Sequence, residues 1–252
     1  MPLSDLQIAL GEMVTAQAAV RRSAADAAPF EGLRLTAAER AWLTQLPDTP
    51  GFSVTCYIQR WWRETKLSWT ARLTLTALGP AQADAAIANY LEATPCPSLF
   101  FTPEALGFLD FVARVAERPH VAEIALFERA LLIAKEAAQQ SADRQPVGNE
   151  LPSSAWLTPH PAAELLEFTA SPEELLGALV EGRALPPACA ARFPVLIAPS
   201  LPHLWRPATA DEARLFTFCQ TTSSIEGLRA LVPNSAPTLQ RLLHASALQY
   251  VV

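Results

Sequence analysis

The stretch SADRQPVGNELPSS, residues 141–154, separates two parts of the chain that differ in pattern. It is polar and contains proline and glycine, as linkers and domain boundaries do, and it lacks the apolar periodicity of a helix or a strand. The whole chain has 252 residues, which is enough for one large domain or two of ordinary size. We therefore expect two domains, residues 1–145 and residues 153–252.

The residues before this stretch carry repeated signals of helix starts and stops. Thr36 and Glu39 form a capping-box pattern, and Gly79-Pro80 is expected to end one helix and begin the next. Residues 52–78 contain no proline or glycine, which allows one helix of up to about seven turns. Residues 121–138, VAEIALFERALLIAKEAA, place apolar side chains at helical spacing. The first domain is therefore predicted to be all-helical.

The residues after the stretch mix the two periodicities. Residues 161–169 fit a strand or a short helix, 171–182 a helix, and 193–199, FPVLIAP, a strand. A strand at 203–206, a helix from Thr209 capped with Glu212, and two short helices at 223–231 and 238–247 follow. The predicted fold class is α+β, an all-helical domain followed by a small mixed module.

Composition and charge weigh against several classes of protein. The formal net charge of −6 disfavours a protein whose main task is to neutralise phosphates, so nucleic acid is not an expected partner. There are 22 prolines against 9 glycines, which disfavours a nucleotide-binding protein with a glycine-rich phosphate-binding loop. No stretch approaches 18 uncharged apolar residues, and the first residues lack the basic region of a signal peptide. We expect a cytoplasmic protein that does not cross a membrane.

Residues with catalytic or metal-binding chemistry are scattered. The four histidines stand alone at positions 120, 160, 203 and 244, without the close spacings of a metal site. No nucleophile motif is present, and the cysteines are expected to be core or near-core thiols: Cys56, Cys96, Cys189 and Cys219. We therefore predict no catalytic residue, no metal site and no cofactor in this chain. An enzyme that acts without a partner protein is the least favoured of three functional hypotheses.

The most unusual segment runs from Tyr57 to Trp69 and combines three of the six tryptophans with three cations. On a helix, one broad stripe holds Ile58, Trp61, Trp62, Thr65 and Trp69. The cations fall nearer the other side: Arg60, Arg63 and Lys66. The simpler interpretation is an aromatic core face with solvated charges. The alternative is a docking surface, because tryptophan and arginine are enriched at interface hot spots.

The second conspicuous cluster is Leu204-Trp205-Arg206-Pro207. A tryptophan and an arginine at the end of a strand are commonly one core and one surface residue. A small mixed domain with an open sheet edge also binds extended peptides, which add to the sheet as a further strand.

Several segments together resemble one protein family. They are the aromatic and basic helix, Asn89-Tyr90-Leu91 with the following Pro95, Phe108-Leu109-Asp110-Phe111, the helix that begins Pro119-His120-Val121, and Leu204-Trp205-Arg206. This order resembles the partner subunits of multinuclear non-haem iron enzymes that modify ribosomally made peptides, as in the methanobactin and thiaglutamate pathways. The thiaglutamate-pathway partner is the nearest match, from the length and the Trp-Trp-Arg helix.

The resemblance implies a division of labour between two proteins. In that family the iron subunit oxidises the precursor peptide, often at a cysteine, and the thiaglutamate reaction excises a cysteine β-carbon. The partner joins a helical domain to a peptide-recognition-like domain, binds the iron subunit as a heterodimer and helps to present the peptide. It implies partner contacts at Arg60, Trp61, Trp62 and Arg63, peptide contacts at Trp205 and Arg206, and iron held by the partner.

A different function class stays open. The chain fits a DNA-binding transcriptional regulator whose N-terminal helices bind the duplex and whose C-terminal module acts as a sensor. That hypothesis relies on four cations between Tyr57 and Leu75, which are Arg60, Arg63, Lys66 and Arg72.

Overall fold

The computed structural model describes residues 3–19, 30, 32–94, 101–140, 152, 154–232 and 235–251. The chain has an α+β fold with a helical N-terminal region, which confirms the predicted class. It divides into two compact units, Met1–Phe111 and Val112–Val252. All but two residues of the 141–154 stretch lie outside the described residues, so the functional boundaries 1–145 and 153–252 stay a prediction.

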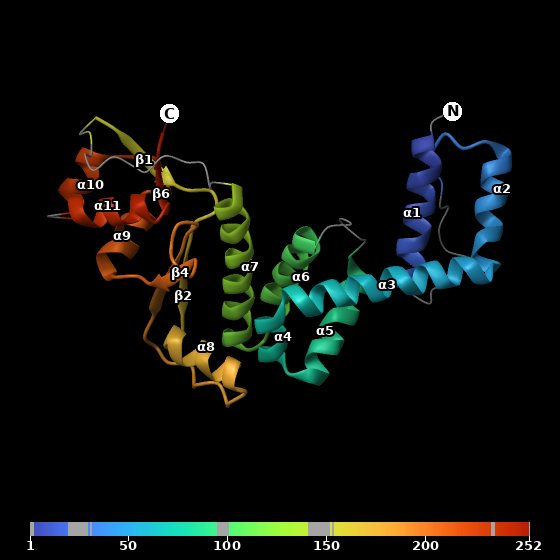
Figure 1. The fold of residues 1–252 in the computed structure, drawn as a ribbon, viewed down its shortest axis with the longest axis horizontal. Helices are drawn as coiled ribbons and strands as arrows, with labels where there is room; N and C mark the ends of the chain where they lie inside the picture. The colour runs from blue at the N-terminus through green and yellow to red at the C-terminus, as the bar shows by residue number, and fades with distance from the viewer. Residues whose placement is uncertain are drawn as a thin grey trace. The chain divides into compact units, whose positions relative to one another are not determined.

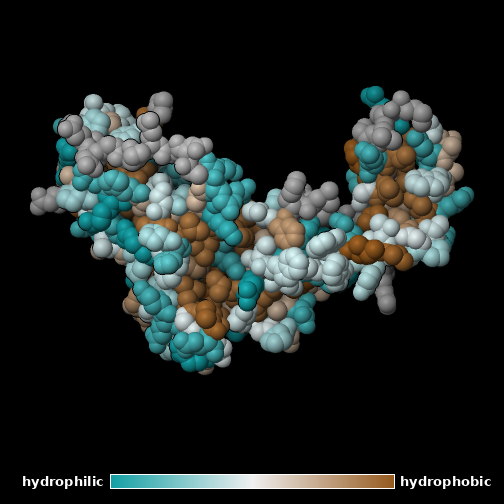
Figure 2. Space-filling view, viewed as in Figure 1, coloured by the Kyte–Doolittle hydropathy of each residue, from teal (hydrophilic) through white to brown (hydrophobic). Residues whose placement is uncertain are grey.

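The first unit is built from helices. Its elements are α1 (Leu3–Ala19), α2 (Ala37–Gln45), the 3₁₀ turn η1 (Leu46–Asp48), α3 (Pro50–Thr70), α4 (Arg72–Leu78), α5 (Pro80–Ala93) and the first part of α6 (Phe101–Val115). Figure 1 shows α1 and α2 side by side at the N-terminal end of α3. Ala9, Phe30 and Leu43 form a small buried core there. Figure 2 shows hydrophobic surface in brown in the region of α1 and α2.

Local signals set several helix ends of this unit as predicted. The Thr36 side chain accepts from the Glu39 amide, and the Glu39 carboxylate accepts from the Thr36 amide, which completes the capping box. Gly79 ends α4 with a φ of 79°, a conformation that glycine adopts without steric cost, and Pro80 begins α5.

The single helix allowed over residues 52–78 is instead two helices, α3 and α4. The break lies at Ala71, which is fully buried and has φ −111° and ψ 39°. The Thr70 hydroxyl donates to the Lys66 carbonyl at 2.6 Å, a side-chain bond of the kind that bends helices. No proline or glycine marks the break, so none of the usual sequence signals indicates it.

The second unit places helices around two antiparallel sheets. Its helices are α7 (Pro119–Gln140), α8 (Pro172–Glu181), α9 (Ala210–Phe218), α10 (Ile225–Leu231) and α11 (Ala236–His244). Its strands are β1 (Trp156–Pro159), β2 (Glu164–Phe168), β3 (Phe193–Ile197), β4 (Trp205–Pro207), β5 (Ser223–Ser224) and β6 (Leu248–Tyr250). The strand orders are β5-β1-β6 and β2-β3-β4.

The core of this unit fills the space between the sheets and helices. Leu157 of β1, Leu196 of β3, Leu215 of α9 and Leu242 of α11 belong to one buried cluster. Helix α7 packs against β2 and β3, as Figure 1 shows. The predicted strands at 193–199 and 203–206 and the helix from Thr209 are present. Strands β1, β5 and β6 were not predicted: β1 and β6 lie outside the segments assigned to a strand or a helix, and β5 begins the segment 223–231, which was predicted to be helical.

Candidate functional site

Helix α3 packs the opposite way round from the simpler sequence interpretation. Arg63 and Lys66 are 2% and 5% exposed, whereas Trp61 and Trp69 are 50% and 63% exposed. Arg63 and Lys66 therefore face the interior of the first unit, and the aromatic stripe faces outward.

A buried carboxylate explains why Arg63 lies inside. Arg63 Nε and Nη2 donate to Oε1 of Glu104, which is fully buried in α6, at 3.0 and 2.8 Å. Nη2 also donates to the Thr94 carbonyl at 3.0 Å. Charge-assisted bonds of this kind satisfy a buried guanidinium that would otherwise be strongly unfavourable.

The ring of Tyr90 completes this buried network. The Arg63 guanidinium lies 5.8 Å from the Tyr90 ring centroid, and the Tyr90 hydroxyl donates to the Glu104 carbonyl at 3.3 Å. Burial raises the pKa of Tyr90, and the Glu104 charge adds to this effect. Sequence reasoning missed Glu104, because it lies 41 residues from Arg63 and shares no local spacing with it.

The exposed side of α3 is a continuous apolar surface, which we call the tryptophan face. It comprises Val54, Tyr57, Ile58, Trp61, Trp62 and Trp69 of α3 together with Phe101 of α6. Each of these side chains is exposed, and the six on α3 span about 140° of the helix circumference. Figure 2 draws much of the surface over α3 as pale, because the hydropathy scale ranks tryptophan and tyrosine near its middle.

Ring contacts hold the tryptophan face in order. Trp61 and Trp62 have centroids 5.2 Å apart, and Trp69 stacks on Phe101 at 6.0 Å with 12° between the planes. Trp62 meets Phe101 edge-on at 6.4 Å, and Lys66 Nζ lies 6.0 Å from the Phe101 centroid. The aromatic side chains of two helices therefore form one ordered patch, to which sequence reasoning had not added Phe101.

The four residues predicted to bind a partner thus divide into two groups. Trp61 and Trp62 are exposed. Arg60 is partly exposed, and its Nε donates a hydrogen bond to Glu64 Oε1 at 2.9 Å. Arg63 makes its contacts inside the chain, so it acts on this surface only by fixing α3. The same burial takes Arg63 and Lys66 away from the phosphate contacts that the DNA-binding hypothesis gives them.

Both residues predicted to bind a peptide take part in the packing of the second unit. Trp205 lies edge-on to Phe127 of α7, with centroids 5.4 Å apart. Arg206 forms a fork with the buried Glu212 carboxylate through two bonds of 2.8 Å, and Arg241 Nε donates to the same carboxylate at 3.2 Å. Arg206 thereby joins β4 to α9.

Glu212 is held as a carboxylate. Burial alone would raise its pKa, but the bonds from Arg206 and from the Thr209 amide outweigh this effect and lower the pKa to about 2. Thr209 and Glu212 also form the predicted capping box at the start of α9. Local capping and long-range ion pairing therefore converge on one side chain.

Strand β6 forms one edge of the sheet β5-β1-β6. Val251 N donates to the Trp156 carbonyl, and His160 N donates to the Ala247 carbonyl. Alternate residues along β6 and its flanks therefore bond to β1. The register leaves the amides and carbonyls of Leu248 and Tyr250 directed away from β1. Trp156, 52% exposed and paired with Val251, lies at the same strand pair. Leu248 is 2% exposed and Tyr250 is partly exposed, so only the Tyr250 end of this edge is accessible to another strand.

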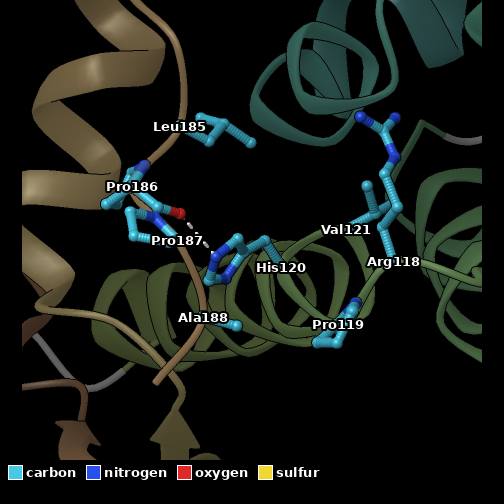
Figure 3. A pocket seen from close by; sticks show the side chains of 8 residues that line it. All are labelled: Arg118, Pro119, His120, Val121, Leu185, Pro186, Pro187 and Ala188. Carbon is cyan, nitrogen blue, oxygen red and sulfur yellow. Dashed lines mark hydrogen bonds between the residues drawn. The ribbon is translucent and has the colours of Figure 1, made fainter.

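A cavity of about 310 Å³ lies at the start of α7 and is shown in Figure 3. His120 Nε2 binds the Pro186 carbonyl at 2.8 Å, while Glu123 accepts from the Thr169 amide at 3.1 Å. His120 Nδ1 lies 3.3 Å from Glu123 Oε2 and 3.4 Å from Thr169 Oγ1, so these three side chains meet beside the cavity. In Figure 3 the Arg118 guanidinium points away from the His120 ring. The cavity is a packing junction between α7 and residues 185–188.

The remaining chemical groups are dispersed. Among the described residues, no three His, Cys, Asp or Glu side chains lie close enough together to hold a metal ion. Cys56 and Cys219 are buried as predicted, and burial raises the pKa of both thiols, that of Cys219 to about 11. Cys189 is exposed, which contradicts its predicted burial, and Cys96 lies outside the described residues. No described helix combines the length and apolar character needed to cross a bilayer.

No protein-family model matches the chain, and no curated protein matches it significantly.

Proposed function

We propose that this chain is a non-catalytic, cytoplasmic partner subunit that binds a multinuclear non-haem iron oxidase and presents a ribosomally made precursor peptide to it. The tryptophan face is the observation that carries the proposal. A soluble protein rarely leaves this much contiguous aromatic surface exposed unless another molecule covers it.

The character of this surface favours a protein partner. Three tryptophans and a tyrosine supply large contact areas with few rotatable bonds, and the buried Arg63–Glu104 pair fixes the helix that carries them. The resemblance of the aromatic helix to the partner subunits of iron enzymes supplies the identity of the partner. Iron and the oxidation chemistry then belong to that enzyme.

The edge of β6 is the proposed site for the precursor peptide. Edge strand β2 carries Glu164 and Glu167, charges of the kind that protect a sheet edge, and β4 contains Pro207, which has no amide to donate. Strand β6 is uncharged, and the amide and carbonyl of its partly exposed Tyr250 are directed away from β1. A peptide bound there would gain backbone bonds, and Trp156 would contact its side chains.

The resemblance also supplies the reaction class. The partner would oxidise a cysteine of the bound peptide. The specific case proposed is excision of the cysteine β-carbon, as in thiaglutamate formation. In this proposal the chain contributes binding and orientation, and no residue of it carries a catalytic role.

Co-expression with iron enzymes encoded by adjacent reading frames tests partner binding. We expect one complex that co-elutes in size-exclusion chromatography and contains iron. The Trp61→Ala/Trp69→Ala variant should lose the complex, whereas Trp156→Ala, which removes an equally exposed tryptophan from the second unit, should keep it. A chain that turns over a peptide unaided, or a complex unaffected by the double variant, would overturn the proposal.

Peptide binding is tested separately on the purified complex. Tyr250→Pro removes an outward amide of β6 without removing a bond to β1, so it should weaken precursor binding at least tenfold while the iron complex still forms. Arg206→Ala tests the prediction from sequence that Arg206 contacts the peptide. If it abolishes peptide binding and Tyr250→Pro does not, the β6 site is wrong.

A further inference from the structure

The loop between α8 and β3, residues 183–192, lies on the surface of the second unit. It has neither helix nor strand, and all of its residues are partly or fully exposed. Pro186 and Pro187 have no backbone amide to donate. The Pro186 carbonyl bonds to the His120 ring, and the Cys189 amide donates to the Thr169 carbonyl at 2.7 Å. A segment with few buried contacts detaches at a small cost in free energy.

The His120 ring lies between two hydrogen-bond acceptors. Nε2 is 2.8 Å from the Pro186 carbonyl oxygen, the bond drawn as a dashed line in Figure 3, and Nδ1 is 3.3 Å from Oε2 of Glu123. A carbonyl and an ionised carboxylate accept and do not donate. Both contacts are therefore hydrogen bonds only when both ring nitrogens carry a proton.

A neutral ring has one proton, for which the two acceptors compete. Hydrogen bonds to a charged acceptor are roughly twice as strong as those to a neutral one. The Glu123 carboxylate therefore keeps the proton on Nδ1, and the Thr169 hydroxyl, 3.4 Å away, is placed to accept from it as well. Nε2 is then left with a lone pair that faces the Pro186 carbonyl oxygen.

From this competition we infer that His120 is a pH-dependent latch for residues 183–192. At mildly acidic pH the doubly protonated ring bonds to Glu123 and to the Pro186 carbonyl, and the loop is docked. Loss of one proton, in the range where histidines titrate, breaks the bond to Pro186 and releases the loop. Because the docked state holds the additional proton, docking weakens as the pH rises.

Glu123 provides the charge that sets the position of the remaining proton. It is 13% exposed and the His120 ring 12%, so solvent screens their interaction only in part. Arg118 points away from the ring in Figure 3. On β2, Glu167 is exposed, on the opposite strand face from Phe168, which packs on α7. In the loop, Arg183 is paired with a glutamate at the end of α8.

This latch goes beyond the proposed function and stands without it. Its residues lie in the second unit and belong neither to the tryptophan face nor to the β6 edge. Release of the loop would uncover the side of the cavity that Leu185 and Pro186 line. The apolar surface that the protein presents there would then depend on pH.

Hydrogen exchange of the full chain measures docking of the loop. After correction for the intrinsic effect of pH on exchange, the Cys189 amide should lose protection roughly tenfold between about pH 5.5 and about pH 8. The Thr169 amide, which donates to Glu123, should stay protected and serves as the internal reference. Equal protection of the Cys189 amide at the two pH values would overturn the inference.

Matched variants separate the latch from a purely structural role. Glu123→Gln keeps an oxygen for the Thr169 amide but removes the charge, so the loop should stay docked at about pH 8. His120→Gln should abolish the pH dependence. His203→Gln, which changes an exposed histidine in the turn between β3 and β4, should leave it intact. An unchanged pH dependence in Glu123→Gln or in His120→Gln would contradict the latch.

Nitrogen chemical shifts of the His120 ring test the mechanism in the unaltered chain. We expect protons on both ring nitrogens at about pH 5.5 and on Nδ1 alone at about pH 8. A neutral ring with its proton on Nε2 would keep the bond to Pro186 and overturn the inference. Failure of the proposed function shows separately, as absence of an iron complex.

Discussion

Each unit of the molecule holds a buried glutamate paired with arginine, Glu104 in the first and Glu212 in the second, and the two pairs differ in how far the arginine is from water. In the first unit, Arg63 is buried with Glu104 and reaches no solvent. In the second, Arg206 and Arg241 approach the buried Glu212 from the surface and stay partly exposed. The first pair belongs to the core of a helical unit, and the second clamps a strand and two helices together at the surface.

The comparison shows how a buried ion pair governs what a helix displays. Because Arg63 needs Glu104, α3 turns its cationic side inward and its tryptophans outward. In the second unit the arginines are satisfied at the surface, and the large aromatic side chains Phe127, Phe168 and Phe216 fill the core. The predictions below test this difference, from the largest effect to the smallest.

Removing the Glu104 carboxylate should have the largest effect. Glu104→Ala leaves the Arg63 guanidinium buried without its counter-charge, a change that typically costs about 3–5 kcal/mol of unfolding free energy. Urea denaturation followed by tryptophan fluorescence measures the loss. The double variant Arg63→Met/Glu104→Leu should recover most of it, because apolar side chains of similar volume replace the pair. A loss below about 1 kcal/mol for Glu104→Ala would show that the pair does not fix α3.

The Glu212 clamp should give a pH-dependent effect. Its pKa falls from the ordinary 4.5 to about 2 on folding, so the carboxylate stabilises the fold above pH 4.5 and loses this contribution as the pH falls towards 2. Because Arg206 and Arg241 are partly exposed, solvent screens their interaction with Glu212, and the ionised carboxylate contributes about 2 kcal/mol to the unfolding free energy at pH 7. Thermal unfolding of wild type and Glu212→Gln should differ at pH 7 and converge near pH 2. A difference that persists at the lower pH would contradict the assignment.

A methyl group at Gly107 should disturb the Tyr90 contact of the first unit. A Cβ there would lie 2.7 Å from the Tyr90 hydroxyl, and the buried Tyr90 ring is held between Phe108 and Phe111. Gly107→Ala should therefore lower the unfolding free energy by about 1–2 kcal/mol, after the gain in helix propensity is included. Chemical denaturation at pH 7 tests this value.

The matching change in the second unit should have the opposite sign. A Cβ at Gly177 of α8 would meet only the flexible end of Arg183, at 3.9 Å. Gly177→Ala should raise stability by about 0.5–1 kcal/mol, the ordinary gain for a helical position. A thermal shift upward for Gly177→Ala and downward for Gly107→Ala would confirm that only the first site is sterically closed. A loss at Gly177 would contradict the open environment described here.

Much of the secondary structure could be predicted, and the reason is that caps act locally. Thr36 with Glu39, Gly79 with Pro80, and Thr209 with Glu212 each mark a helix end within four residues. Of the candidate site, Trp61 and Trp62 were predicted to dock and are exposed. The β6 edge could not be found from sequence, because a three-residue strand exists only through its pairing with β1.

The sequence by itself determined the capped helix ends, the α+β class and the concentration of tryptophans in one helix, because these follow from neighbouring residues. Only the tertiary structure decided which side of α3 faces outward. Its periodicity allowed either side to be buried, and the choice depended on Glu104, a carboxylate 41 residues away that compensates Arg63 inside the fold. Burial of a charge depends on its partner in space, and no local pattern in the chain records that partner.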